Sequence, residues 1–409
     1  MDITNKIQLT YTPEPVQGFI TAGIHSGIKS DPTALDLGLI YCENTVAAAG
    51  VFTANVAKAA PVTLNQEHLK CSTPKAILIN SGNANACTGE QGINDAIKSS
   101  MWVATALGLK KEDVLISSTG IIGVPLPMDA LEKGIPELAS SLSSDQIGQT
   151  AEAIMTTDTF SKAVTVTFEI DGKPGQITGI AKGSGMIHPN MATMLGFIMT
   201  DVSISSEQLN QSLKNITDVS FNMISVDGDT STNDMVLALA SGASDAPIVN
   251  TENSSAVFKK ALTLACTELA KLIAKDGEGA TKLLEMEVVG ATSIQDASLA
   301  AKAVIASSLV KSAFFGNDAN WGRILCAMGY SGAEFDPQKV DLSISSKQGS
   351  IQLMKSGTPV VFDEDNALQV LSTDSIHILA DMNQGSSKAT AWGCDLTYDY
   401  VKINGEYRS

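Results

Sequence analysis

Hydrophobic residues recur along this sequence with the two spacings that distinguish helices from strands. From residue 90 to residue 107 they follow a helical spacing, and Gly108 stands where a helix commonly ends. The expected buried stripe of this helix consists of Ile93, Ile97, Met101 and Ala104. Further helices are expected near Ser144, Ser206 and Asn253, and a helix of small residues is expected over 293–311.

Alternating apolar and polar positions predict strands between these helices. Val164, Val166, Phe168 and Ile170 alternate with polar residues, and the turn-forming stretch 171–175 follows, which predicts an antiparallel hairpin. A second alternation over 392–400 predicts a long strand near the C-terminus. No linker rich in Pro, Ser or charge separates these elements. We therefore expect one continuous fold of the α+β class, built as a layered sandwich.

The composition limits the partners of the protein. Its 409 residues carry a formal net charge of −17, which would repel both nucleic-acid phosphates and an anionic membrane surface. No run reaches the roughly 18 apolar residues of a membrane span, and the first residues lack a basic segment followed by an apolar stretch. We expect a globular cytoplasmic protein with no nucleic-acid or membrane partner.

Metal and cofactor sites are not expected. The six cysteines form no Cys-x-x-Cys pair, and no two histidines have the spacing of a helical zinc site. The acidic stretch 227–231 resembles a calcium loop, but Thr232 and Ala238 occupy the positions that require glycine and glutamate. The stretch 182–185 lacks the spacing of a phosphate-binding loop. These patterns therefore predict no metal and no cofactor.

The segment with the most specific chemistry is a loop that becomes an apolar strand at Thr193. If the Thr193 hydroxyl attacks the carbonyl carbon of Ala192, an N-to-O acyl shift and ester hydrolysis would free a terminal amine beside the hydroxyl. Such an amine titrates near about 7.7–8.0, so its neutral fraction can act as the base that activates the hydroxyl. A threonine that merely begins a strand is the ordinary alternative, and the spacing alone does not exclude it.

Several sequence blocks in one order resemble the ornithine acetyltransferase family, also called glutamate N-acetyltransferase. The similar blocks are 18–29, 81–86, 118–123, 155–158, 182–196, 225–234, 317–323 and 403–407. The resemblance implies a fold akin to amino-terminal-nucleophile hydrolases. It also implies self-cleavage into an α chain, 1–192, and a β chain, 193–409, with two of each in an α2β2 heterotetramer. The implied reaction moves an acetyl group from N-acetylornithine to Thr193 and then to glutamate, in arginine synthesis.

The same resemblance implies roles for individual residues. Thr119 and Gly120 match the oxyanion hole, although an ordinary Ser-Thr-Gly turn is the alternative from the residues alone. Lys182 is expected to contact a substrate carboxylate. The remaining implied substrate contacts, besides Thr193 itself, are Thr156 (chosen over Thr157), Glu278, Asn404 and Ser409. His188 lies in the cleavage loop, and its role stays open between assisting the acyl shift and a purely structural one.

Two rival functions remain at this point. The first keeps the cleaved threonine but lets water take the acyl group, as in an amino-terminal-nucleophile aminopeptidase or amidohydrolase. The second is a non-enzymatic binding protein in which the glycine loops only permit tight turns. Nothing in the sequence decides whether acetyl-CoA also serves as acetyl donor, which would make the enzyme bifunctional.

Overall fold

The apolar run that follows Thr193 forms β9 (Leu195–Thr200), and all six of its residues are buried. In this computed structural model, which describes residues 7–188 and 194–406, β9 pairs with β8 on one side and with β11 on the other. A central strand covered on both faces requires such an unbroken apolar sequence. Its six-stranded sheet has the order β1 (Gln8–Thr10), β7 (Lys162–Ile170), β8 (Lys173–Lys182), β9, β11 (Met235–Ala240) and β4 (Ala47–Phe52).

The predicted hairpin is confirmed as β7 and β8. Asp171 and Gly172 join the two strands with positive φ angles of 50° and 79°, as a two-residue hairpin turn requires. The turn is therefore shorter than the predicted stretch 171–175, and Lys173 already pairs with Ile170. This hairpin carries Lys162 at its beginning and Lys182 at its end.

A second sheet packs against the inner face of the first. It has the order β2 (Ile20–Ile24), β3 (Leu37–Tyr41), β5 (Ala76–Asn83) and β6 (Val114–Ile121). Ile79 and Leu115 from this sheet share one apolar cluster with Phe197 and Leu237 from the six-stranded sheet. The two sheets are therefore the inner layers of a sandwich.

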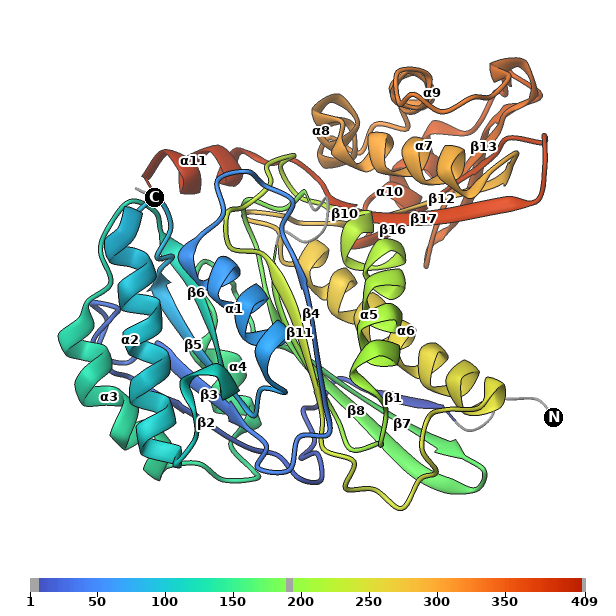
Figure 1. Ribbon diagram of the computed structural model, residues 1–409. Coiled ribbons are helices and arrows are strands. Elements are labelled where there is room, and N and C mark those ends of the chain that lie inside the picture. Colours follow the sequence, from blue (N-terminus) through green and yellow to red (C-terminus); the bar gives the residue numbers. More distant parts are fainter. Residues whose placement is uncertain (1–6, 189–193, 407–409) are drawn as a thin grey trace.

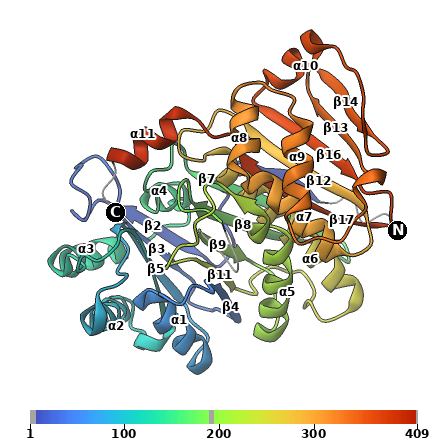
Figure 2. The ribbon, with the colours of Figure 1, turned by 90° about the horizontal axis from the view of Figure 1, so that it is seen from above.

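Helices form the outer layers, as Figures 1 and 2 show. On the six-stranded sheet lie α5 (Ser206–Val219) and α6 (Glu252–Lys275), and on the four-stranded sheet lie α2 (Gly89–Leu107) and α3 (Met128–Ser140). The edges are flanked by α1 (Ala60–Cys71) beside β6 and by α4 (Ile147–Ala153) beside β2. The predicted layered α+β sandwich is confirmed by this four-layer arrangement.

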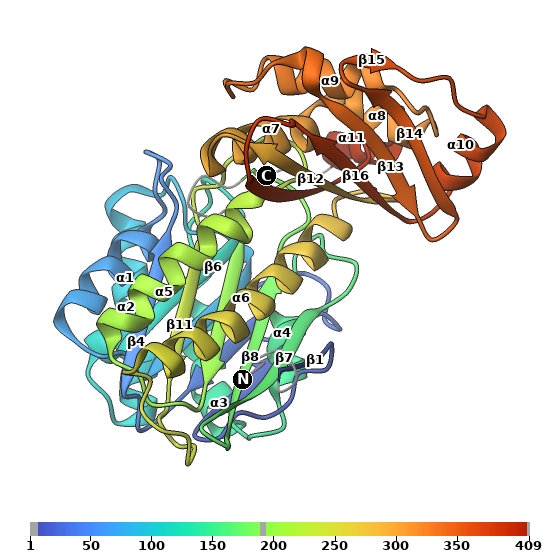
Figure 3. The same ribbon diagram turned by 90° about the vertical axis from the view of Figure 1, so that its right-hand side faces the viewer.

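The C-terminal part forms a further lobe, seen edge-on in Figure 1 and from the side in Figure 3. Its seven strands have the order β10 (Ile224–Ser225), β17 (Ser387–Cys394), β12 (Leu283–Ala291), β16 (Ser375–Asp381), β13 (Asp341–Ser346), β14 (Gly349–Lys355) and β15 (Thr358–Pro359). Its helices are α7 (Ile294–Ala306), α8 (Ser308–Phe315), α9 (Trp321–Gly329) and α10 (Glu364–Leu371). Short 3-10 turns lie at Lys111–Asp113, Phe221–Met223 and Pro337–Lys339. One apolar core runs from the six-stranded sheet through α6 into this lobe.

The predicted helix α2 is confirmed, and Gly108 ends it in the left-handed conformation, but of the four residues of its expected buried stripe only Ala104 is buried. Ile93 and Met101 are 44% and 50% exposed. Small residues make up the buried face instead: Gly92, Ala96, Ser99, Ser100, Val103 and Ala104. Because α2 packs against α1, α3 and β6 at once, short side chains allow the close approach that bulkier ones would prevent.

Two further predictions need correction. The expected helix 293–311 is divided at Ser307, whose side chain accepts the N–H of Val310 and so begins α8. The expected strand over 392–400 ends at Cys394, and Tyr398 and Tyr400 belong to α11 (Tyr398–Glu406). Thr397 explains this change, because its hydroxyl accepts the N–H of Tyr400 as a helix cap does.

No single helix in the ranges 7–188 and 194–406 is long and apolar enough to cross a membrane. The bent pair of α7 and α8, which meet at 57°, passes that test together by length and composition alone.

Candidate active site

One pocket of about 170 Å³ brings together the predicted site residues that the structure describes. Its wall includes Thr119, Gly120, Thr156, Lys182, Glu278 and Asn404. Met194, which directly follows Thr193 in the sequence, also lines it. Thr156 and Thr157 both face the pocket, so the choice between them stays a prediction. The other predicted site residues, Ala192, Thr193 and Ser409, lie outside the described residues.

Thr119 and Gly120 lie near the end of β6, where its pairing with the neighbouring strand β5 becomes irregular. Gly120 has a φ of 132°, and a Cβ at this position would lie 2.3 Å from the carbonyl carbon of Gly82. Only glycine fits this close approach of the two strands, and Gly120 also lines the pocket. A hydroxyl and a backbone N–H on adjacent residues of a pocket wall are the kinds of donor that an oxyanion hole requires.

Lys182 is the last residue of β8, and only 8% of its surface is exposed. Its Nζ donates a hydrogen bond to Oγ1 of Thr119 at 3.3 Å. Burial lowers the pKa of Lys182, whereas the charges of Asp158, Asp234 and Glu278 oppose that shift. The positive charge of Lys182 is therefore only partly compensated by the Thr119 hydroxyl and by the charges of these three carboxylates.

Behind the pocket wall lies a fully buried ion-pair cluster of Lys162, Asp158 and Asp276, which we call the Lys162 cluster. Nζ of Lys162 lies 2.6 Å from a carboxylate oxygen of each aspartate. Asp158 also accepts the N–H groups of Thr156 and Gly183, at 2.9 and 2.8 Å. The cluster thereby joins the Thr156 loop, the end of β8 and the end of α6.

The pKa of Asp158 reflects this environment. Burial raises it, but the charges of Lys182 and Lys162, together with hydrogen bonds from Lys162 and Thr156, outweigh burial and lower the pKa to about 2. Asp158 therefore stays ionised at any pH near neutrality.

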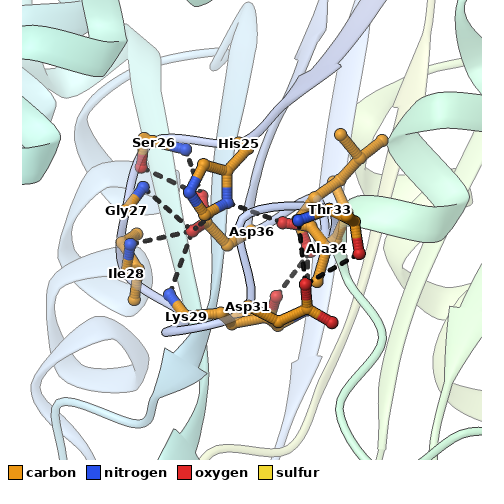
Figure 4. A network of polar contacts seen from close by, with 12 residues as sticks. His25, Ser26, Gly27, Ile28, Lys29, Asp31, Thr33, Ala34 and Asp36 are labelled. Atoms are coloured by element: carbon orange, nitrogen blue, oxygen red, sulfur yellow. Dashed lines mark hydrogen bonds and ion pairs between the residues drawn. The ribbon is translucent and has the colours of Figure 1, made fainter.

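A second buried carboxylate, Asp36, supports the Thr156 loop from further away, and Figure 4 shows the loop that folds around it. Asp36 accepts the backbone N–H groups of residues 26–29 at 2.6 to 3.1 Å. The loop folded around it carries Lys29, whose Nζ donates to the carbonyl of Met155 at 2.8 Å. Since Met155 directly precedes Thr156, this contact fixes the backbone at the pocket wall.

Glu278 and Asn404 form the outer rim of the pocket. Nδ2 of Asn404 donates to Oε2 of Glu278 at 2.7 Å, so α11 contributes to the same site as the loop after α6. A Cβ on Gly185 would come within 2.4 Å of the Glu278 carboxyl, which shows that the carboxylate lies directly on the Gly185 backbone. Figure 1 shows α11 reaching away from the seven-stranded sheet toward the four-layer sandwich.

The segment that leads toward Thr193 is held by the acidic stretch that resembles a calcium loop. The Asp227 carboxylate accepts the N–H groups of Met186 and Ile187 at 2.6 and 2.8 Å. Nδ1 of His188 lies 3.0 Å from Oγ of Ser225. Burial, assisted by the nearby charge of Lys302, lowers the pKa of His188 to about 4, so the ring is neutral near pH 7. Asp227 thus binds backbone instead of a cation.

Four pocket or supporting residues were missed by sequence reasoning: Asp158, Lys162, Asn233 and Asp234. Asn233 and Asp234 line the pocket. Asp234 could have been found from the sequence, because it stands directly before six buried apolar residues. Burying a carboxyl group there costs free energy, so its presence indicates a function. Likewise Asp158 and Lys162 are four residues apart at the start of a buried strand. Among the described residues, no group of three or more His, Cys, Asp or Glu side chains could hold a metal ion.

The four-layer sandwich with its polar pocket defines an enzyme of the layered α+β class. The chain belongs to the ArgJ family, whose sequence model matches residues 20–409. It is 53% identical over 392 residues to arginine biosynthesis bifunctional protein ArgJ 1 of Clostridium acetobutylicum, with 96% of each chain covered. It is also 53% identical over 394 residues to arginine biosynthesis bifunctional protein ArgJ of Caldanaerobacter subterraneus, with 96% of this chain and 97% of the relative covered.

A solved structure agrees with this assignment. The crystal structure of arginine biosynthesis bifunctional protein ArgJ from Bacillus halodurans matches with 48% identity and a TM-score of 0.50, over 53% of this chain and 100% of that one. The family that the sequence blocks implied is therefore confirmed, and the chain is an acyltransferase of arginine biosynthesis.

Proposed function

We propose that this protein cleaves itself between Ala192 and Thr193 and then transfers an acetyl group from N-acetylornithine to glutamate through an acetyl ester on Thr193. One observation carries the proposal. Thr119 and Gly120 from β6, the buried side chain of Lys182, and Met194, the neighbour of Thr193, line a single pocket. Acyl transfer needs donors for an oxyanion and a nucleophile at such a point.

Cleavage begins when the Thr193 hydroxyl attacks the carbonyl carbon of Ala192 and the C–N bond breaks, which leaves an ester and a free amine. Water then hydrolyses the ester and yields an α chain, 1–192, and a β chain, 193–409. The match to the Bacillus halodurans chain supports this division. That whole chain corresponds to 53% of the present one, and residues 193–409 make up the same share, 217 of 409 residues.

The transfer follows the same chemistry with a substrate amide. The freed amine of Thr193 takes the proton of its own hydroxyl, and the oxygen attacks the acetyl carbonyl of N-acetylornithine. The Thr119 hydroxyl and the Gly120 N–H stabilise the tetrahedral oxyanion. Ornithine leaves, and the amine of glutamate attacks the acetyl ester to give N-acetylglutamate.

Both substrates carry an α-carboxylate, and Lys182 is the cation that receives it. Among the described residues, Thr119 is the hydrogen-bond partner of the Lys182 ammonium group, so its charge is only partly compensated, which favours this role. Glu278 accepts the side-chain ammonium of ornithine, and Asn404 orients Glu278 through their hydrogen bond. Thr156 and Ser409 complete the proposed substrate contacts. The small-molecule substrate class is supported by the pocket volume of about 170 Å³.

Three finer statements belong to the proposal. Acetyl-CoA serves as a second donor for N-acetylglutamate, which the word bifunctional in the names of the relatives favours. The fragments assemble as an α2β2 heterotetramer. The enzyme works in the cytoplasm without a metal or other cofactor.

Denaturing electrophoresis and product analysis test the proposal. The wild type should run as two fragments of similar size and the Thr193→Ala variant as one. With N-acetylornithine and glutamate, the wild type should form N-acetylglutamate. A single intact wild-type band would refute self-cleavage. Hydrolysis of N-acetylornithine at one rate with or without glutamate, and no N-acetylglutamate, would favour the rival aminopeptidase-type function instead.

A further inference from the structure

Asp234 has a buried carboxyl group in the pocket wall. The reaction proposed above does not involve this group. It is 2% exposed and lines the same pocket as Thr119 and Lys182. No residue in the described ranges donates a hydrogen bond to its Oδ2. A buried carboxyl oxygen without a donor is costly, so its position at a reactive pocket calls for an explanation.

The backbone on both sides of Asp234 is fixed. Asn233 donates through Nδ2 to the carbonyl of Ser118 at 2.8 Å, which ties it to the residue before Thr119. On the other side, the N–H of Met235 donates to the carbonyl of Met194 at 3.0 Å. Asp234 is therefore held between the end of β6, which carries Thr119 and Gly120, and Met194, which directly follows Thr193 in the sequence.

The charged groups that share the pocket with Asp234 are Lys182 from β8 and Glu278 from the loop after α6. Burial raises the pKa of Asp234 well above its ordinary value, although Ser231, Lys182 and Thr53 stabilise the ionised form in part. A carboxyl in such surroundings can hold a proton and release it when a nearby group changes charge.

Acetyl exchange between two amines requires one stored proton. When the amide C–N bond of the donor breaks, the departing nitrogen takes up the Thr193 hydroxyl proton, passed on by the Thr193 amine, and one further proton, and it leaves as an ammonium ion. The acceptor arrives as an ammonium ion and must lose a proton before its nitrogen can attack the acetyl ester. The donor half of the cycle thus consumes one proton and the acceptor half returns one.

We propose that the Asp234 carboxyl is the proton-transfer group of this exchange. The inference rests on the proposed acetyl transfer. Asp234 gives its proton to the departing amine, stays ionised while Thr193 carries the acetyl group, and takes the proton back from the incoming ammonium. While it is ionised, Asp234 also attracts the acceptor ammonium. This is the stage of the cycle at which the acceptor must bind.

The test compares substrates that need this proton with substrates that do not. The Asp234→Asn variant keeps the shape of the side chain but loses the proton. Its acetylation by N-acetylornithine should be slower by about 10²- to 10⁴-fold, the usual range for a lost general acid. Acetylation by p-nitrophenyl acetate should stay near the wild-type rate, because nitrophenolate leaves without a proton. Likewise hydroxylamine, which is largely neutral at pH 7, should still remove the acetyl group when glutamate does so slowly.

Asp201→Asn is the matched control. Asp201 is also buried with a raised pKa, because burial outweighs its hydrogen bonds, but it lies beyond the end of β9 and outside the pocket. It should show no difference between the two kinds of substrate. Equal losses with N-acetylornithine and p-nitrophenyl acetate in Asp234→Asn would overturn the inference. An uncut Asp234→Asn chain would also overturn it, because the carboxyl would then be needed before any substrate binds. If the wild type itself forms no N-acetylglutamate, the proposed function fails instead.

Discussion

Two lysines on neighbouring strands, Lys162 and Lys182, differ in how completely their charges are satisfied. Lys162 has no exposed surface, and its Nζ contacts two carboxylates at 2.6 Å each. Lys182, beside it at the open end of the same hairpin, has one hydroxyl at 3.3 Å among its described hydrogen-bond partners. The fully paired lysine has no capacity for a further anion, whereas the incompletely paired one can accept a substrate carboxylate.

This difference in pairing indicates that the two lysines have different roles. A buried charge with two carboxylate partners stabilises one arrangement of the chain, because any other arrangement would leave three charges buried and unpaired. A buried charge with a weak partner raises the free energy of the empty pocket. Binding of an anion beside that charge lowers the free energy again. Asp158 connects the two, because its charge acts on both lysines. The Lys162 cluster is therefore structural, and Lys182 belongs to the proposed chemistry.

The largest expected effect comes from breaking the Lys162 cluster. The Lys162→Met variant would leave the carboxylates of Asp158 and Asp276 buried without their cation. We expect the free energy of unfolding to fall by about 3–5 kcal/mol, the usual cost of removing one member of a buried ion pair. Urea denaturation followed by circular dichroism measures it. The control is Lys347→Met, which removes an exposed ion pair with Asp374 and should change stability by about 1 kcal/mol or less.

Substitution of Lys182 is expected to have a smaller effect, and on catalysis instead of stability. The Lys182→Met variant removes a buried cation whose described hydrogen bond is weak, so stability should change little. The kcat/KM for N-acetylornithine should fall roughly 10- to 100-fold, as expected for a lost hydrogen bond to a charged group. Steady-state kinetics and urea denaturation of the same preparation give both values. A loss of stability equal to that of Lys162→Met, with unchanged kcat/KM, would contradict the distinction between the two lysines.

The strands near the site can be predicted from the sequence, whereas the ion pairs behind the pocket wall cannot. The hairpin of β7 and β8 and the strand after Thr193 follow from alternation and from an apolar run, because both patterns are local. The Lys162 cluster is not predictable in this way. Asp158 and Asp276 are 118 positions apart, and no local pattern indicates that they share one cation.

The C-terminal end of the chain shows why local patterns also mislead. Tyr398 and Tyr400 continue the alternation of β17, but the Thr397 hydroxyl accepts a backbone N–H and begins α11 instead. Asn404 could be assigned to the site from the family resemblance alone. What brings it to Glu278 is a helix that the alternation did not predict.

The smallest expected effect concerns this rim contact. Asn404 is exposed, and its hydrogen bond to Glu278 competes with water, unlike the contacts of either lysine. The Asn404→Ala variant should therefore raise KM for N-acetylornithine roughly 2- to 10-fold, with kcat and stability nearly unchanged. The Asn404→Asp variant sharpens the comparison, because a second carboxylate beside Glu278 removes the same hydrogen bond but adds a negative charge. If Glu278 binds the ornithine ammonium, Asn404→Asp should bind N-acetylornithine more tightly than Asn404→Ala does. Weaker binding by Asn404→Asp than by Asn404→Ala would place the ammonium elsewhere in the pocket.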